Sequence, residues 1–289
     1  MLALRSFSES HLEDLVGLQQ YIFPITKHWS IEEARNQLMD LARNGGSNVL
    51  EVIEGDVVKG FIGWVSNSET REFYGSPFVA LTEDAARLLM EQLLIKAQAL
   101  NAAFVRVSAY QFESEKKLAF LKLNFYKKFD FIDLEISLEN WEQSNLPALN
   151  YQIIKSTEVD YIKYRDLCNK AFLNVENSPP ISEELSRELW QSSMLHQDLS
   201  CVLTDDEGNY VAFMIVFKDG YIDSIGVLPS LHGRKIGSAL YEMLFSRAKE
   251  LNCFNLHSTI ASNNQGSLSL HEKFGFSETG RREVWQFDL

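Results

Sequence analysis

Apolar residues recur at intervals of three and four between Ile236 and Leu251, and this spacing predicts an amphipathic helix. Shorter apolar runs on either side of it indicate strands instead. Two of these runs flank a polar turn sequence at 205–209, a third follows the Asp-Gly dipeptide at 219–220, and a fourth covers 254–260. Because aspartate followed by glycine favours a tight turn, the second and third strands are expected to form a hairpin.

The remainder of the C-terminal half extends this pattern with a strand, further helices and a final hairpin. Ser182 precedes two glutamates and is a suitable N-cap for one of these helices. The full order, β-α-α-β-β-β-α-β-α-β-β, predicts a mixed α/β sheet with helices on both faces. The additional elements are expected at 151–155 (strand), 159–172 and 182–194 (helices), 264–275 (short helix) and 276–287 (hairpin).

The N-terminal half repeats part of this order. The segment LLMEQLLIKAQALNAAFVRVSAY at 88–110 resembles ALYEMLFSRAKELNCFNLHSTIA at 239–261, and LNFYKKFDF at 123–131 resembles LSLHEKFGF at 268–276. Each half therefore has a helix, an apolar strand, a second helix and an F-x-F sequence that begins another strand. This self-similarity predicts a degenerate duplication.

A polar stretch separates the two predicted domains. Residues 137–150 contain Pro147 and lie between two strand-like runs, so the domains are expected at 1–143 and 150–289. A chain of 289 residues in which 45% are apolar can supply two cores of ordinary size.

The charge and the cysteines narrow the classes of function. The net charge of −13 is spread over both halves, which argues against a nucleic acid or an anionic membrane as partner and mildly favours an amine-bearing substrate. No apolar stretch approaches the roughly 20 residues that a membrane-spanning helix needs. The three cysteines form no C-x-x-C pair, and no basic stretch with a long apolar core begins the sequence, so a cytoplasmic protein is expected. No metal site is expected, because His257 and His271 lack partners at ligand spacing.

The stretch GVLPSLHGRKIGSALYEML at 226–244 carries the main candidate chemistry. It leads from a strand through a small, basic, glycine-containing loop into the amphipathic helix, with no acidic residue before Glu242. The start of a helix usually attracts aspartate or glutamate, because its N–H groups are free and its dipole is positive there. A helix start with two glycines, two cations and no acid is suited to an anion from outside the chain.

A sugar-linked diphosphate fits such a loop. Each backbone N–H that donates to a phosphate oxygen contributes about 1.5–3 kcal/mol, and glycine lets the backbone approach closely. For a lone G-x-x-x-G a solvated helix N-terminus is the better interpretation. Here Pro229 also ends the pairing of the preceding strand, which leaves a slot for a linear chain beyond the phosphates. The expected donors are the N–H groups of His232, Gly233, Arg234, Lys235, Ile236 and Gly237.

Three motifs together resemble the GNAT superfamily of acetyl-CoA-dependent N-acetyltransferases: V-x-P at 227–229, HGRKIG at 232–237 and NNQGSLSLHEKFGF at 263–276. The resemblance covers residues 150–289, and the whole chain resembles a tandem GNAT protein with an intact C-terminal half and a degenerate N-terminal half. It implies two α/β domains, each a mixed, mostly antiparallel sheet (α+β) flanked by helices. The first half lacks the glycine loop and is expected not to bind the cofactor.

The resemblance also implies an acetyl-CoA site in the C-terminal half. The family loop has Gln or Arg, two residues, Gly, one residue, then Gly or Ala, and Pro229 anchors a register in which His232, Lys235 and Gly237 hold the signature positions. Only Gly237 conforms, and Lys235 fits if its φ is negative. A second register on Arg234, Gly237 and Ala239 stays open, although we prefer the first. The implied cofactor contacts are Ile225, Gly226, Val227, His232, Gly233, Arg234, Lys235, Ile236, Gly237, Ser238 and Asn264.

Asn264 has two candidate roles. In the family the asparagine side chain holds the pantetheine or phosphate end of the cofactor, whereas the sequence also predicts that Asn264 caps the following helix. The two roles are compatible if Asn263 or Ser262 caps that helix instead.

Amide formation needs an acid for the leaving thiolate and a base for the amine. The family commonly has a tyrosine acid seven residues after the asparagine, and that position here is His271. His271 is therefore the candidate acid, or else a helix-surface histidine that packs against the cofactor. In the alignment of the two halves, Tyr126 stands at the position of His271 and Asp130 at that of Gly275.

Asp223 is the candidate base, because relatives often carry a glutamate at this place on the strand; the shorter aspartate favours a water relay. The alternative is a turn-end residue that pairs with Lys218 or solvent. Further candidates for the base are His257, Ser258 and Glu283, and aromatic or apolar residues that could line an acceptor site, or simply form core, are Phe172, Trp190, Met194 and Trp285.

The main hypothesis is an acetyltransferase that moves acetyl from acetyl-CoA to a primary amine of a small molecule or peptide by direct attack. The atypical loop and the histidine at the acid position keep a rival open: a non-catalytic acyl-CoA-binding sensor or partner-binding pseudoenzyme. A purely structural tandem domain is the third hypothesis.

Overall fold

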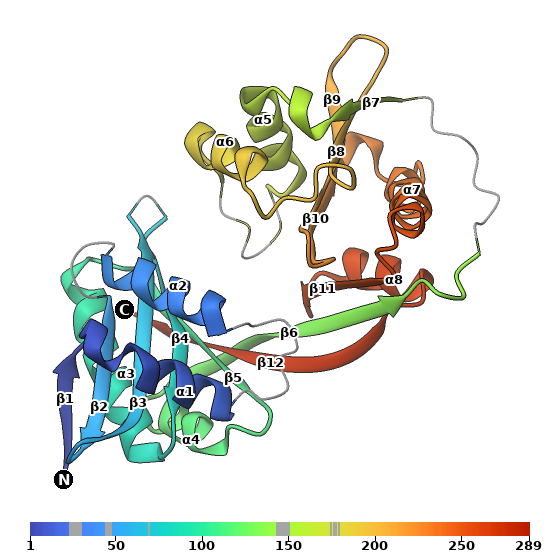
Figure 1. Ribbon diagram of the computed structural model, residues 1–289. Helices are drawn as coiled ribbons and strands as arrows, with labels where there is room; N and C mark the ends of the chain where they lie inside the picture. The colour runs from blue at the N-terminus through green and yellow to red at the C-terminus, as the bar shows by residue number, and fades with distance from the viewer. Residues whose placement is uncertain are drawn as a thin grey trace. The chain divides into compact units, whose positions relative to one another are not determined.

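The chain folds into two compact units (Figure 1). The computed structural model describes residues 1–22, 31–43, 48–68, 70–142, 151–173, 175, 178 and 180–289. Unit 1 comprises Met1–Phe131 and Arg281–Leu289, and unit 2 comprises Ile132–Gly280.

The units divide the chain at places that the sequence did not predict. The expected boundary at 143–150, with Pro147, lies outside the described residues. The assignment to units changes instead within two long strands, β6 (Tyr126–Ser137) and β12 (Ser277–Asp288), so the described residues 132–142 belong to unit 2 and residues 281–289 to unit 1. Each of these strands has 12 residues and contributes residues to both units. Local sequence patterns do not reveal that a single strand is shared in this way.

Unit 1 is built on a mixed sheet. Its strands follow the order β1-β2-β3-β4-β5-β12-β6, in which β4 and β5 run parallel and the other strand pairs with a described register are antiparallel. Its further elements are β1 (Leu2–Ser6), α1 (Leu12–Ile22), α2 (Ile31–Arg43), β2 (Val49–Glu54), β3 (Val57–Asn67), β4 (Glu72–Ala80), α3 (Glu83–Ala99), β5 (Phe104–Tyr110) and α4 (Ser114–Lys122).

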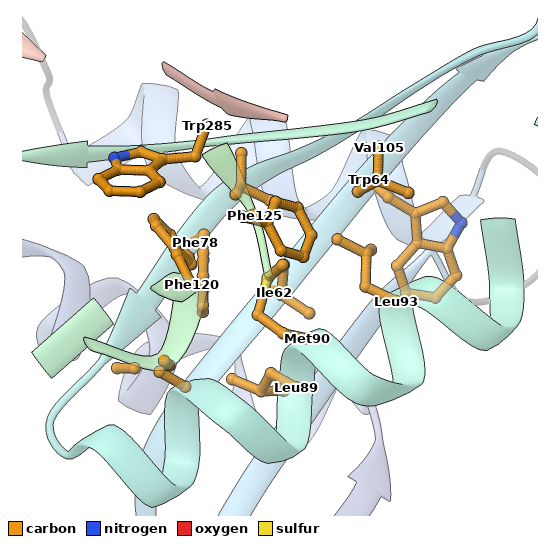
Figure 2. Close-up of a cluster of buried hydrophobic side chains, with 14 of the residues drawn as sticks. Ile62, Trp64, Phe78, Leu89, Met90, Leu93, Val105, Phe120, Phe125 and Trp285 are labelled. Atoms are coloured by element: carbon orange, nitrogen blue, oxygen red, sulfur yellow. The ribbon is translucent and has the colours of Figure 1, made fainter. Parts of the chain in front are cut away.

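Hydrophobic clusters cover both faces of this sheet. Successive residues of a strand point to opposite faces, so Phe61 on β3 joins a cluster with α1 and α2, whereas Ile62 joins a larger one with α3 and α4. Figure 2 shows the larger cluster, in which Trp285 from β12 lies near Phe120 from α4. The last strand of the chain therefore supplies part of the core of unit 1.

Unit 2 has the predicted order of elements up to its last strand. Strands β10, β9, β8 and β7 form an antiparallel sheet in that order, and β11 lies beside β6. Clusters with α5 and α6, and with α7 and α8, pack on this part of the fold. The elements are β7 (Gln152–Lys155), α5 (Tyr161–Ala171), α6 (Glu183–Gln191), β8 (Cys201–Thr204), β9 (Tyr210–Val216), β10 (Ile222–Val227), α7 (Ile236–Glu250), β11 (Asn255–Ala261) and α8 (Gln265–Lys273), with short 3-10 turns at Ser156–Glu158 and Pro229–Leu231.

The predicted hairpin at 276–287 is wrong, because these residues form the single strand β12. The sequence Thr-Gly-Arg at 279–281 resembles a turn. Gly280 instead serves a close approach, since a Cβ at this position would lie 3.0 Å from Oδ2 of Asp133. The glycine is thus explained by packing within the sheet.

The duplication holds, but the second half of the sequence alignment needs correction. The offset that places Ala97 over Ala248 also places Asn124 over Gly275. Both residues directly follow the residue that ends a helix, α4 or α8, and both have left-handed backbone with φ of 60° and 86°. One offset therefore relates α3 to α7 and α4 to α8.

This single offset changes the partner of His271. The residue of unit 1 that corresponds to it is Phe120, not Tyr126, and Asp130 no longer corresponds to Gly275. Tyr126 lies at the start of β6, where its hydroxyl interacts with Asp288 and accepts from Gln286. Tyr126 therefore does not occupy the position in unit 1 that corresponds to the candidate acid His271.

Candidate functional site

The start of α7 has the features of an anion site. Lys235 is its N-cap residue, no side chain caps the helix, and its first turn contains no acidic residue. Gly233 and Lys235 both have left-handed backbone, with φ of 80° and 61°. These two positive φ values turn the chain sharply between the 3-10 turn and the helix.

Four of the six predicted N–H donors have no backbone acceptor in the part of the chain that the structure describes. They belong to Gly233, Lys235, Ile236 and Gly237. The other two are taken within the turn: His232 donates to the carbonyl of Pro229 at 3.2 Å, and Arg234 donates to that of Leu231 at 3.3 Å. In this structure His232 and Arg234 therefore use their N–H groups within the turn, whereas their side chains are exposed.

A third cation lies at this helix start. Lys273, at the end of α8, donates through Nζ to Oγ of Ser238 in the first turn of α7 at 2.9 Å. Ser238 is thus held by a side chain that the sequence analysis did not single out. The sequence carried no signal for Lys273, because its partner lies on another helix.

The positive φ of Lys235 bears on the register of the loop. A lysine at this position was expected to fit only with a negative φ, and the φ of Lys235 is positive. Left-handed backbone is what glycine adopts at little cost, so the observed φ explains why the family has glycine at this position. The condition under which lysine was expected to fit this register is therefore not met, and the choice between the two registers stays a prediction.

We expect Lys235→Gly to stabilise unit 2. Left-handed backbone costs a non-glycine residue about 1–2 kcal/mol, of which the added flexibility of glycine in the unfolded chain returns roughly half. The net gain is about 0.5–1 kcal/mol, visible in thermal unfolding as a rise of about 2–4 °C. Lys170→Gly, at an exposed position of α5 without the positive φ, is the control and should lower the stability by a similar amount.

Strands β10 and β11 meet at one point and pair no further among the described residues. A parallel bridge joins Tyr221 and His257, and Oγ of Ser258 donates to the carbonyl of Ile222 at 2.9 Å. Beyond these contacts β10 pairs only with β9. One edge of β10 is thus open, as the sequence predicted for the strand before Pro229.

The open edge presents backbone groups of Ile225 and Val227. Leu228 donates its N–H to Val211 on β9, and in an antiparallel pair the polar groups of alternate residues point to opposite sides. Those of Ile225 and Val227 therefore point away from β9. The carbonyl of Val227 already accepts from Nε2 of His232 at 3.0 Å.

Gly226 lies between these two residues and is needed for close packing. A Cβ on Gly226 would lie 2.2 Å from a ring carbon of Phe213, directly across on β9. The aromatic ring thus covers the glycine and fixes the strand beside the open edge.

Asp223 stands where β10 bulges. The register between β10 and β9 shifts between Ile222 and Ser224, so Asp223 is the extra residue of a β-bulge. Oγ of Ser224 donates to its Oδ2 at 3.0 Å. No ion pair with the predicted partner Lys218 occurs among the described residues.

The environment of Asp223 raises its pKa above that of an ordinary aspartate. Solvent reaches the carboxylate, yet desolvation by the surrounding protein raises its pKa, while the hydrogen bond from Ser224 opposes that rise. Burial raises the pKa values of Tyr164 and Cys168 on α5, and the charge of the nearby Asp223 raises both further. Tyr164, Cys168 and Ser224 were not found from the sequence; only the spacing of four on α5 could have indicated that two of them share a face.

His271 lies in the core of unit 2. Only 3% of it is exposed, Nδ1 lies 2.8 Å from the carbonyl of Ser267, and Nε2 lies 2.7 Å from the hydroxyl of Tyr241. A carbonyl only accepts, so Nδ1 carries the proton and Nε2 accepts from Tyr241. Neither nitrogen is left to donate to a thiolate, and the acid role expected for His271 is not supported.

We expect His271 to make unit 2 sensitive to acid. Burial lowers the pKa of His271 from the ordinary 6.5. The unfolded chain therefore binds a proton more readily than the folded chain, and the free energy of unfolding falls as the pH drops below about 6.5. The unfolding free energy should therefore be lower at pH 5.5 than at pH 7. Denaturant titrations should show the loss in the native protein and in the exposed-site control His232→Gln, and not in His271→Gln.

Asn264 caps α8 itself. Its Oδ1 accepts from the N–H of Ser267 at 3.1 Å, so neither Asn263 nor Ser262 takes over the cap as the cofactor role was expected to require. The cap uses only the oxygen of the carboxamide. Its amide nitrogen is the group that could serve a ligand.

The other candidate bases have different surroundings. Ser258 is 3% exposed and its hydroxyl donates to Ile222, and Nε2 of His257 lies 3.7 Å from Asp219. Glu283 belongs to unit 1, where it accepts from Nε1 of Trp285.

Most of the side chains considered for an acceptor site are core residues. Trp190 packs against Tyr164 with ring centroids 5.1 Å apart, and Phe172 packs against Phe213 at 5.6 Å. Trp285 is in the core of unit 1. Met194 alone of the four is exposed.

Among the described residues, no group of three or more His, Cys, Asp or Glu side chains is arranged to hold a metal ion. None of the helices within the same residues combines the length and the apolar character needed to cross a bilayer.

The fold is that of a known class of proteins. Residues 164–276 match the model of the Acetyltransferase (GNAT) family. The GCN5-related N-acetyltransferase from Sphaerobacter thermophilus superposes with a TM-score of 0.78 at 15% identity, over 99% of this chain and 95% of that one. A tandem GNAT protein from the clavulanic acid biosynthesis pathway gives 0.71 at 10% identity, over 100% and 98%. No curated protein matches the sequence.

Residues 164–276 are therefore a GNAT acetyltransferase domain, and the resemblance inferred from the sequence is confirmed. The whole chain has the fold of tandem GNAT proteins, with a GNAT-like N-terminal half. The match supports an acetyltransferase in the general sense.

Proposed function

We propose that unit 2 transfers an acetyl group from acetyl-CoA to a primary amine of a small molecule or peptide by direct attack. The observation that carries this proposal is the juxtaposition, within one unit, of the uncapped start of α7, the open edge of β10 and the bulged carboxylate Asp223. A phosphate-binding end, a strand edge and a proton acceptor then follow one another along the same strand and loop. We also propose a cytoplasmic setting for this reaction.

The free groups of the loop fit the diphosphate of acetyl-CoA. The N–H groups of Gly233, Lys235, Ile236 and Gly237 can donate to its oxygens, and the side chains of Arg234 and Lys273 add positive charge. The backbone of Ile225 can pair with an amide of the pantetheine arm as an added strand would. Acetyl-CoA supplies a thioester carbonyl that an amine can attack.

The state of the cysteines favours direct attack over an acyl-cysteine intermediate. Burial raises the pKa of Cys168 to about 11 and that of Cys201 to about 12, and it also raises the pKa of Cys253. All three thiols are therefore protonated near neutral pH, where only a thiolate would be an effective nucleophile. The amine itself forms the new C–N bond as the C–S bond breaks.

Asp223 is proposed to take up the proton that the amine loses, through a water molecule because the side chain is short. Its raised pKa brings it nearer to neutrality than an ordinary carboxylate, which suits a base. With both nitrogens of His271 occupied, solvent is left to protonate the departing thiolate. A carboxylate at this end also suits a cationic acceptor.

The binding half of this proposal can be tested by giving α7 the acids that it lacks. Arg234→Glu/Lys235→Asp should weaken acetyl-CoA binding in calorimetry by about a hundredfold or more, because two cations beside the diphosphate are replaced by anions. Aspartate tolerates left-handed backbone, so the fold should survive. Lys155→Glu/Lys170→Asp makes the same change in net charge elsewhere in unit 2 and should leave the affinity unaltered. Equal affinity in the folded double variant would contradict the site.

The transfer half needs an activity measurement. Protein, acetyl-CoA and a panel of polyamines, amino acids, aminoglycosides and peptides are incubated together, and the release of free thiol is followed. Turnover that depends on both the amine and Asp223 supports the proposal.

The second candidate function is a non-catalytic acyl-CoA sensor. The observation that favours it is the burial of His271, which leaves this unit without a side-chain acid at the family position. Tight binding of acetyl-CoA with no thiol release across the panel would favour the sensor.

A further inference from the structure

We infer that the side chain of Lys116 fills, in unit 1, the place that the pantetheine arm would take in unit 2, so that the chain has one acyl-CoA site and an internally closed copy of it. The inference rests on the proposed function for the identity of the ligand. The closure itself rests on contacts within unit 1.

The strand edges of the two units correspond residue by residue. Leu81 donates its N–H to Lys59 on β3, just as Leu228 donates to Val211 on β9, and both residues follow the last residue of their strand. Counting back from these leucines places Phe78 of β4 at the position of Ile225. By the same alternation, the carbonyl of Phe78 points away from β3, toward the open side of its strand.

In unit 1 that carbonyl is occupied by an internal group. Nζ of Lys116 donates to the carbonyl of Phe78 at 2.8 Å and lies 4.7 Å from the centre of its ring. The same ammonium donates to both carboxylate oxygens of Glu113, at 2.9 and 3.1 Å. Lys116 is only 2% exposed, so protein surrounds the whole side chain.

One residue of this ion pair, Glu113, stands at the position of Asn264, whose amide nitrogen is the group of unit 2 that could serve a ligand. Glu113 and Asn264 are the N-cap residues of α4 and α8, and the offset that relates the helices places Lys116 over Ser267. Where unit 2 has a small hydroxyl and an amide, unit 1 has a long cation and its counter-ion. Glu113 is fixed in turn, because its Oε2 accepts from the N–H of Tyr110 at 2.8 Å.

The start of α3 is closed to an anion as well. Thr82 caps the helix through its hydroxyl, which accepts from Ala85 at 3.2 Å, and Glu83 and Asp84 occupy the first turn. Only residues 81 and 82 connect β4 to α3, whereas residues 228–235 connect β10 to α7. Unit 1 therefore lacks the long loop that unit 2 presents, and Lys122, the counterpart of Lys273, pairs with Glu83. The acids at this helix start repel a diphosphate.

The ion pair between Lys116 and Glu113 is buried. Desolvation lowers the pKa of Lys116, and the charge of Glu113 opposes that change. Removal of one partner leaves a buried charge without its counter-ion, so single variants are poor tests of this inference. The experiment changes both residues together.

The test opens unit 1 by giving it the residues of unit 2. Glu113→Asn/Lys116→Ser is made in the Arg234→Glu/Lys235→Asp background, and pantetheine, which has the arm without the diphosphate, is the probe. Hydrogen exchange of β4 amides should slow by about threefold at a pantetheine concentration near twice its dissociation constant. Glu113→Gln/Lys116→Met, which keeps the space filled, should show no such slowing, and neither should the native pair.

Two outcomes would overturn the inference. One is pantetheine protection of β4 in the protein that keeps Lys116 and Glu113; the other is no protection in a folded opened variant. If the opened variant does not fold, acetyl-CoA is titrated into the Arg234→Glu/Lys235→Asp protein instead. Absence of residual binding supports a closed unit 1. Residual binding that protects the β4 amides refutes the inference. Failure of the native protein to bind acetyl-CoA at all would refute the proposed function of unit 2 and leave the pantetheine result on unit 1 readable.

Discussion

Deletion of residues 281–289 is expected to unfold unit 1. These residues pair with β5 at seven positions, from Arg282 opposite Tyr110 to Asp288 opposite Phe104. They also carry Trp285 into the core, where its ring centroid lies 5.8 Å from that of Phe120 (Figure 2). Loss of a buried tryptophan alone costs about 3–5 kcal/mol, and loss of a strand from the middle of a sheet exposes β5 as well. The sum approaches the whole stability of an ordinary domain, about 5–15 kcal/mol.

Hydrogen exchange measured by peptide is the appropriate readout, because it separates the two units. Amides of β4, β5 and α3 should lose their protection in the deletion variant. Deletion of Leu289 alone is the matched control: this residue is exposed, follows the end of β12 and makes one backbone hydrogen bond, to Ala103. It should change the stability by less than about 1.5 kcal/mol. Full protection of β5 after removal of residues 281–289 would show that β12 is dispensable.

The elements of unit 2 were predictable because each has a strong local signal. The stripe of apolar residues in α7, the Asp-Gly turn before β10 and the cap by Ser182 all act within a few residues of sequence. The strand β12 was not predictable from such signals. Its glycine at 280 resembles a turn, and the reason for it, contact with Asp133, lies far away in the sequence.

The candidate site was predictable to a similar extent. The sequence shows no acidic residue at the start of α7, and in the structure this helix start has neither an acidic residue in its first turn nor a side-chain cap. The burial of His271 is not visible there, because it depends on Tyr241, which approaches from another helix. The φ of Lys235 and the contact between Lys273 and Ser238 also depend on how the chain turns in space. Backbone donors and helix starts are local properties, whereas the protonation chemistry of a side chain is set by distant neighbours.

Comparison of the two halves of the chain defines the candidate site better than either half does alone. The same architecture in unit 1 has Thr82 and two acids at its helix start, and Lys116 against its strand edge. These differences are the ones that an anion and an extended arm would demand. Comparison of the two copies thus separates residues that the shared fold requires from residues that only the proposed acetyl-CoA site requires.

Asp223→Asn is expected to lower kcat of unit 2 by about 10²–10⁴, the usual worth of a positioned base, with little change in the affinity for acetyl-CoA. The amide keeps the size of the side chain and its place in the bulge but cannot accept the proton that the amine loses. Steady-state kinetics with an amine from the active panel, together with calorimetry of acetyl-CoA, separates the two effects. A variant with unaltered kcat would exclude Asp223 as the base.

The pH dependence gives this assignment a second, independent readout. Activity should fall as the pH drops through the pKa of Asp223, and because burial raises that pKa, the acid limb should lie above the value of about 3.9 for an ordinary aspartate. Ser224→Ala removes the hydrogen bond that lowers the pKa. Its acid limb should therefore move to higher pH while the plateau of kcat is largely retained, and Asp223→Asn should lose the limb altogether. An acid limb that stays in place in both variants would mean that another group takes up the proton, since only the titrating base and its direct hydrogen-bond donor can move it in this way.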